Sequence, residues 1–103
     1  MTDYTPERIR LLKRGIDLTS GDRNEAYGPP YDNLTACAEM WRSYVVAKYG
    51  HATAMYFSAE DVAHMMTLVK MTRTFHGSYH ADNYLDGAVY QAIAGECRLE
   101  EER

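Results

Sequence analysis

Hydrophobic residues recur at the spacing of an α-helix in four segments of this chain, and short breaks containing Gly or Pro separate them. The four segments run over 5–20, 30–50, 58–77 and 80–97. Apolar residues three and four positions apart share one face of a helix. No stretch alternates as a β-strand does, apart from a short piece at 54–57. The pattern therefore predicts an all-α chain, a compact bundle of four helices with a long polar loop between the first and the second.

The first segment begins with a signal for a helix start. Thr5 is a suitable N-cap, and Pro6 fits the first helical position, where its missing N–H would have no partner anyway. Ile9, Leu12 and Ile16 then recur at helical spacing and form an apolar stripe, with Leu11 and Leu18 beside it. We expect this stripe to face the core.

The next two segments carry their own end signals. Asp32 or Asn33 would cap the second helix, and Gly50 would end it. Ser58 and Asp61 form a capping box at the start of the third helix. In that helix the apolar pattern extends to Phe75, and Gly77 would close it. The fourth helix would begin at His80 or Asp82.

The length of 103 residues fits a single helical domain over 1–103, with a frayed acidic tail from about 97 to 103. A domain of this size buries only about 60–70% of the surface that its unfolded chain exposes, so a homo-oligomer would add stability. Aromatic residues are unusual in kind: nine are Tyr, against two Phe and one Trp. Tyr suits interfaces and pockets that stack flat ligands, and it also suits the edges of a small core.

Charge and cysteine content limit the partners and the compartment. The net charge of −4 argues against duplex nucleic acid as a partner, because such binders carry a basic excess. Cys37 and Cys97 lack metal-ligand spacing, and we interpret them as small apolar residues in a reducing compartment. There is no signal peptide and no apolar run near the ~18 residues of a membrane span. We expect a cytoplasmic protein without a membrane partner.

Charged residues fall on or beside the apolar faces of the third and fourth helices. In a helical projection Arg73 lies in the middle of the apolar arc, His76 lies within it and Lys70 at its edge. A buried arginine must be paired or must line a cavity. Asp82 and Asp86 are four apart and share one flank of the last helix. Either Arg73 pairs with one of these carboxylates, or all five side chains line a polar pocket.

The polar loop over 20–31 has the composition of a ligand-binding segment. Gly21 and Gly28 permit positive φ angles. Loops of this length are more often functional or disordered than short ones. Its candidate ligand-binding residues are Asp22, Arg23, Tyr27 and Tyr31. Arg23 suits a bidentate grip on phosphate, and a tyrosine suits stacking on a base. The alternative is an ordered connector whose charges cap helix ends.

These residues carry a resemblance to a known family. The motif Gly21-Asp22-Arg23-x-x-x-Tyr27-Gly28, followed by 60–73 and by His80-x-Asp82-x-x-x-Asp86-x-x-x-Tyr90, resembles a family of small phage and prophage proteins of unassigned function. The match spans about 17–95. The family's recurring polar positions correspond here to Asp22, Arg23, Tyr27, Asp61, Lys70, Arg73, Asp82 and Asp86. The resemblance implies a protein of the cytoplasm of an infected bacterial host.

A wider resemblance is to the MazG-like all-α nucleoside triphosphate pyrophosphohydrolases, which are small helical oligomers that hold magnesium with ExxE and ExxD motifs. This chain lacks the ExxE motif in its second segment, where Glu39 stands alone. If the protein were such an enzyme, the resemblance implies Mg²⁺ as cofactor, and carboxylates are its preferred ligands. Its candidate ligands would be Glu60, Asp61, Asp82 and Asp86.

Three functions follow as expectations. The first is a phage-encoded binding protein without a cofactor or metal, which sequesters a nucleotide-derived small molecule and could act as an anti-defence sponge of an immune signal. Its ligand-binding residues would be Asp22, Arg23, Tyr27, Tyr31, Lys70, Arg73, His76, Asp82 and Asp86. The second is the Mg²⁺-dependent pyrophosphohydrolase. The third is an inhibitor that contacts a host protein directly through exposed Tyr and Met residues.

Overall fold

A computed structural model of the chain describes residues 4–21, 28–51 and 55–103. It confirms the all-α prediction: four helices pack together, and the described residues include no strand. The helices are α1 (Glu7–Thr19), α3 (Pro30–Tyr49), α4 (Ala59–Thr72) and α5 (Ala81–Glu101). None of the four, as far as they are described, combines the length and apolarity that crossing a membrane requires.

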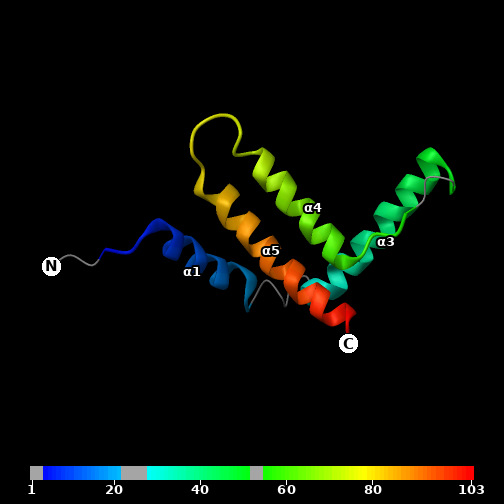
Figure 1. The fold of residues 1–103 in the computed structure, drawn as a ribbon, viewed down its shortest axis with the longest axis horizontal. Coiled ribbons are helices and arrows are strands. Elements are labelled where there is room, and N and C mark those ends of the chain that lie inside the picture. The colour runs from blue at the N-terminus through cyan, green and yellow to red at the C-terminus, as the bar shows by residue number, and fades with distance from the viewer. Residues whose placement is uncertain (1–3, 22–27, 52–54) are drawn as a thin grey trace.

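The centre of the fold is an antiparallel hairpin of α4 and α5 (Figure 1). Its core is built mainly from small side chains, which lets the two helices approach closely. Val62 and Cys97 are the largest side chains that are fully buried. The other buried members of the cluster are Leu34, Ala38, Ala59, Ala63 and Ala94. The hairpin is thus the most tightly packed part of the molecule.

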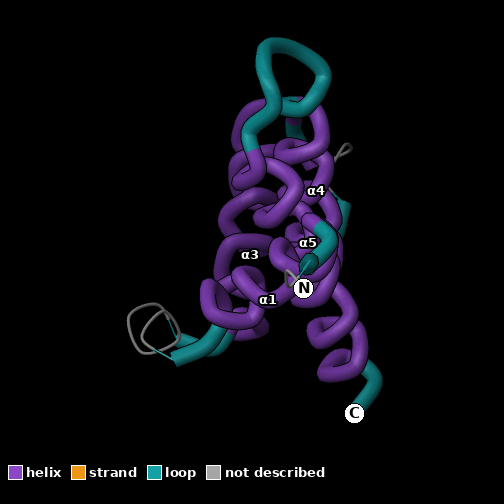
Figure 2. Tube along the Cα trace, turned by 90° about the vertical axis from the view of Figure 1, so that its left-hand side faces the viewer, coloured by secondary structure: helices purple, strands orange, loops and turns teal. Residues whose placement is uncertain are grey.

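Helix α1 lies alongside α5 (Figure 2), the one described helix against which it packs. The contact includes a glycine, Gly15. A Cβ at Gly15 would lie 3.2 Å from Val89 Cγ2 and 3.5 Å from Leu85 Cδ1. The predicted apolar stripe is buried only in part: Leu12 and Ile16 are exposed, whereas Ile9 and the neighbouring Leu11 and Leu18 are half-buried. The reason is that the glycine allows the closest backbone approach on a different face of the helix.

Helix α3 packs on α4 and α5 only through its first half. Leu34 and Ala38 are buried there, and the Trp41 ring meets the Phe57 ring edge-on with centroids 6.0 Å apart. Beyond Trp41 the helix leaves the hairpin at an angle (Figure 1). We call this part, residues 42–49, the α3 arm. The molecule is extended as a result, measuring 63 × 35 × 24 Å.

Helix starts match the sequence signals in two cases out of four. The capping box is confirmed: Asp61 N donates to Ser58 Oγ at 3.0 Å, and Ser58 N donates to Asp61 Oδ2 at 2.9 Å. His80 is the N-cap of α5, as one of the two predicted options stated. The caps predicted for α1 and α3 were wrong. The observed N-caps, Pro6 and Pro29, are prolines, which pre-set a φ angle suited to a helix start.

Helix ends differ more from the sequence pattern. Gly50 is the C-cap of α3 with φ 87°, as predicted. Helix α4 ends at Thr72, several residues before Gly77, because Thr74 N and Phe75 N turn back to the carbonyls three residues earlier. Helix α5 continues to Glu101, through the stretch where we expected a frayed tail.

Candidate functional site

The clearest hollow in the described part of the chain is a cleft along α5, where the end of α1 and the start of α3 meet it. Its narrower part has a volume of about 180 Å³. The lining residues are Leu18, Thr19, Gly28, Pro30, Asn33, Leu34, Asp86, Val89, Tyr90 and Ile93. Gly28 and Pro30 belong to the segment 20–31 that was predicted to bind a ligand, so the described end of that segment lines the narrower part.

A wider part of the same cleft has a volume of about 520 Å³. Both parts share Thr19, Pro30, Val89 and Ile93, so we treat them as one feature, the α5 cleft. The wider part adds Pro29, Tyr31, Asp32, Ala92, Glu96 and Glu100. Its border is therefore acidic, while its floor is apolar. A ligand with several phosphates would be repelled from this end.

Among the predicted site residues, Asp86 and Tyr31 line the α5 cleft. Asp86 Oδ2 lies 3.1 Å from Lys70 Nζ, and this ion pair is largely buried, with 28% and 16% of the two side chains exposed. Tyr31 lies in the first turn of α3 and packs against the core cluster. Of these three residues, Lys70 and Asp86 are in direct contact, while Tyr31 lines the wider part of the cleft, farther along α5.

Arg73 does not pair with Asp86 or Asp82, so that prediction was wrong. Asp86 binds Lys70, and Asp82 Oδ1 accepts from Arg14 NH2 at 3.0 Å on the surface. Arg73 is the exposed C-cap of α4 and makes no ion pair with the described carboxylates. Arg73 keeps its helical position, since its N–H donates to Val69 O. The projection failed because the apolar arc is itself exposed at this end of α4, where Val69 is 41% exposed.

The remaining predicted ligand-binding residues fall outside the cleft or outside the described chain. His76 lies exposed in the bend between α4 and α5. It lines neither part of the α5 cleft, and nor does Asp82. Asp22, Arg23 and Tyr27 lie outside the described residues. Their part in a site stays a prediction from sequence.

The four carboxylates named for a magnesium site do not meet within one chain. Glu60 and Asp61 lie at the start of α4, beside the end of α5, whereas Asp82 and Asp86 lie at the start of α5. Between Asp82 and Arg98, the partner of Glu60, α5 rises about 24 Å. No group of three or more His, Cys, Asp or Glu side chains fit to hold a metal is found in the described ranges.

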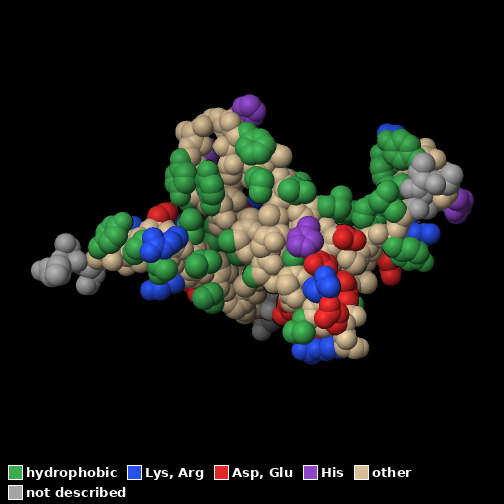
Figure 3. Space-filling view, viewed as in Figure 1, with side chains coloured by type: hydrophobic (Ala, Val, Ile, Leu, Met, Phe, Trp, Pro, Cys, Tyr) green, Lys and Arg blue, Asp and Glu red, His purple; other side chains and the backbone are tan. Residues whose placement is uncertain are grey.

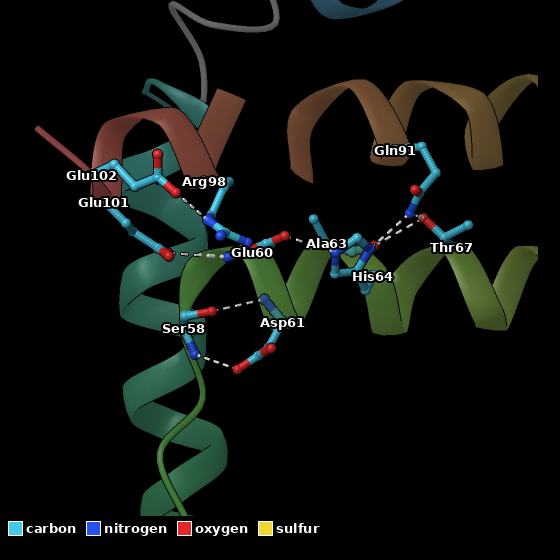
Figure 4. Close-up of polar contacts among 10 residues, drawn as sticks. All are labelled: Ser58, Glu60, Asp61, Ala63, His64, Thr67, Gln91, Arg98, Glu101 and Glu102. Atoms are coloured by element: carbon cyan, nitrogen blue, oxygen red, sulfur yellow. Dashed lines mark hydrogen bonds and ion pairs between the residues drawn. The ribbon is translucent and has the colours of Figure 1, made fainter. Parts of the chain in front are cut away.

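Glu60 instead belongs to a row of polar contacts between α4 and α5 (Figure 4). Its carboxylate lies 3.0 Å from His64 Nε2 and 3.7 Å from Arg98 NH1. Its backbone N–H donates to Glu101 Oε1 at 3.3 Å. These contacts tie the start of α4 to the end of α5.

The same row fixes the tautomer of His64. The hydroxyl of Thr67 donates to Ala63 O, so its Oγ1 accepts from the Gln91 amide at 2.9 Å. That amide nitrogen also lies 3.0 Å from His64 Nδ1, and it has only protons to offer. His64 Nδ1 therefore accepts, and its Nε2–H donates to Glu60. His64 is thus a half-buried part of the contact between α4 and α5.

Tyr90 and Asn33 are cleft residues that the sequence reasoning did not name as site residues. Tyr90 lies four residues after Asp86, so it shares that flank of α5, and this spacing was the signal that could have identified it. Asn33 gave no such signal, because its place depends on where α3 begins. Both add hydrogen-bonding capacity to the narrower part of the cleft.

Comparison with known proteins identifies relatives of the chain. A family model described as "Domain of unknown function (DUF6378)" matches residues 10–98. The "Gene 55 protein" of Mycobacterium phage L5 is 32% identical over 94 residues, which are 91% of this chain and 56% of that protein. The "Gene 55 protein" of Mycobacterium phage D29 is 31% identical over 80 residues, 78% of this chain and 48% of that protein. The chain thus spans about half the length of these relatives.

No solved structure matches the chain. The family match and the two phage relatives support the resemblance to phage proteins of unassigned function. The fold described above rests on the chain's own structure. The names of these relatives state no activity.

Proposed function

The chain belongs to the DUF6378 family, and on that premise we propose that it is a phage-related protein that binds and sequesters a nucleotide-derived small molecule in the α5 cleft. The observation that carries the proposal is the cleft itself. Its narrower part is lined by Asp86, by Tyr90 and by Gly28, which belongs to the polar loop. Sequestration of an immune signal would make such a protein an anti-defence factor of the phage.

The size of the cleft indicates that one ring of the ligand, a base or a ribose, occupies its narrower part. Sites that enclose a drug-sized ligand have volumes of about 300–1,000 Å³. The narrower part, at about 180 Å³, has room for a base or a ribose rather than a whole dinucleotide. The rest of the ligand would extend along the wider part or towards the loop.

The lining chemistry supports a nucleoside end in the narrower part. Asp86 accepts hydrogen bonds from ribose hydroxyls or from an exocyclic amino group, and its charge is offset by Lys70 at 3.1 Å. Tyr90 and Asn33 offer further partners, and an aromatic ring stacks on any base.

Phosphate groups are assigned to the loop side of the cleft. Glu96 and Glu100 line the other side and would repel them. Arg23, which lies outside the described residues, is the candidate for these groups from sequence alone, because a guanidinium grips phosphate with two hydrogen bonds. Lys70 is already paired with Asp86, so its part is to balance that carboxylate rather than to bind phosphate alone.

Calorimetric titration with cyclic and ADP-ribose-type nucleotides tests the proposal. The unmodified protein is expected to bind at least one of them. Tyr90→Ala is expected to weaken binding roughly tenfold or more, because stacking on one aromatic ring contributes about 1–3 kcal/mol. Tyr84→Ala is the matched control, since Tyr84 is exposed on the same helix outside the cleft. No heat with any nucleotide would refute the proposal.

The same samples test the enzymatic alternative. Mass spectrometry of the titrated nucleotides, with Mg²⁺ present, is expected to recover them intact. Release of pyrophosphate that Asp86→Asn abolishes would favour the pyrophosphohydrolase instead. Its four candidate carboxylates lie at two ends of the α4–α5 hairpin, so no observation within the chain favours it.

A further inference from the structure

Much of the apolar surface of this chain has no covering element within the described residues. The α3 arm and the segment after it expose Tyr44, Tyr49, Met55 and Tyr56, and just before the arm α3 exposes Met40. The outer face of α4 exposes Met65, Leu68 and Val69, which lie at i, i+3 and i+4. Such spacing is that of a stripe that packs against another element.

These two surfaces face a common space. Helix α3 covers α4 around Val62 and Met66 and then diverges from it. The rest of the apolar face of α4 is therefore not covered by α3. Figure 3 shows hydrophobic side chains along both sides of the notch that opens between the hairpin and the α3 arm. We call this space the α3–α4 notch.

The exposed area of the chain is that of a subunit rather than of a closed monomer. A compact monomer of 11.8 kDa exposes about 5,900 Å², whereas this chain exposes 7640 Å². The excess is on the order of 1,000 Å² or more. A stable interface removes about 800 Å² from each partner, and obligate homodimers remove more. The radius of gyration agrees, at 16.3 Å against about 13 Å for a compact domain of this length.

We propose that the α3–α4 notch is the interface with a second copy of this chain, related by a two-fold axis. In such a pair each α3 arm packs on the α4 stripe of the partner, so one contact occurs twice. Methionine on both surfaces favours this packing, because its flexible side chain fills irregular gaps. The proposal uses no residue of the α5 cleft and stands independently of the ligand.

Three leucines provide a matched test, because they are exposed to nearly the same extent on three helices: Leu12 by 57%, Leu68 by 56% and Leu99 by 53%. Each is changed to Glu, and the mass of the full chain is measured by light scattering after size exclusion. The unmodified protein, Leu12→Glu and Leu99→Glu are expected at twice the mass of 11.8 kDa. Leu68→Glu is expected at the monomer mass or in a concentration-dependent mixture.

A second measurement guards against loss of folding in the variant. The melting temperature of the unmodified protein is expected to rise with protein concentration, as it does when folding and association are coupled. On the arm, Tyr44→Glu is expected to dissociate the pair, whereas Tyr84→Glu on α5 is not. A monomer at every concentration overturns the proposal. So does a dimer that Leu12→Glu or Leu99→Glu disrupts and Leu68→Glu leaves intact.

Discussion

At the scale of single residues, two ion pairs on α5 have the same chemistry and different surroundings. Lys70 and Asp86 are mostly covered, whereas Arg14 and Asp82 leave 53% and 76% of their side chains in water. Exposed pairs contribute about 0–1 kcal/mol because water and salt screen them. A covered charge that loses its partner has no such compensation.

We therefore predict that Asp86→Ala lowers the free energy of unfolding by about 1–3 kcal/mol, the cost of leaving the Lys70 charge covered and unpaired. Asp82→Ala, on the same helix, is expected to change it by less than about 0.5 kcal/mol. Urea denaturation at one protein concentration measures both. Equal losses in the two variants would show that the Lys70–Asp86 pair is not protected from solvent.

The buried thiol of Cys97 makes the stability of the fold depend on pH in the alkaline range. Burial, together with the nearby carboxylates of Glu101 and Glu96, raises the pKa of the Cys97 thiol from 9.0 to about 11. The folded state thus keeps a proton that the unfolded state releases, so the stability gained is full below pH 9 and is lost as pH rises towards about 11. Melting temperatures are expected to fall less steeply over this window in Cys97→Ala than in the unmodified protein. Parallel curves would contradict the assignment.

At the scale of helices, the sequence pattern identified which segments are helical, but it did not identify the face that α1 buries. In α1 it favoured the largest apolar side chains, whereas the structure buries Gly15 against Val89 and Leu85. Packing density decides this choice, and it depends on the partner helix, which periodicity does not encode. In α4 the apolar face around Val69 is exposed rather than buried at this end of the helix, so Arg73 on that face is exposed as well.

The docking of α1 gives a prediction at this scale. Gly15→Leu places a side chain where even a Cβ would lie 3.2 Å from Val89, so it is expected to cost about 1–3 kcal/mol and to detach α1 from α5. Gly95→Ala in α5 meets nothing within 4 Å and is expected to stabilise by about 0.5–1 kcal/mol. Thermal unfolding by circular dichroism compares the two. A neutral Gly15→Leu would mean that α1 does not dock as described.

The same variant connects the helix to the proposed function. Leu18 and Thr19 at the end of α1 form one wall of the α5 cleft. Loss of α1 docking is therefore expected to weaken nucleotide binding in Gly15→Leu and to leave it unchanged in Gly95→Ala.

At the scale of the whole molecule, helix content and the four-helix architecture could be predicted from sequence, while the extended shape could not. Local periodicity reports that α3 is a helix over its full length, yet only its first half packs on the hairpin. In our proposal the α3 arm packs against a second copy of the chain. The spacing of apolar residues does not show whether a helix packs within its own chain or against another one.

The candidate site could be predicted in part for a related reason. Asp86, Lys70 and Tyr31 were named from helical position and loop composition; Asp86 and Tyr31 line the two parts of the cleft, and Lys70 pairs with Asp86. Tyr90 and Asn33 were not, because three helices must meet before the cleft exists. Long-range assembly, rather than any local motif, creates this site.

Mass spectrometry of the small molecules released from the protein tests the central claim most directly. The protein is purified from infected bacterial cells without added ligand and is then denatured. We predict that a nucleotide is released from the unmodified protein and from Tyr84→Ala, and that it is lost from Tyr90→Ala. Absence of any nucleotide from the unmodified protein, or equal recovery from Tyr90→Ala, would contradict a nucleotide site in the α5 cleft.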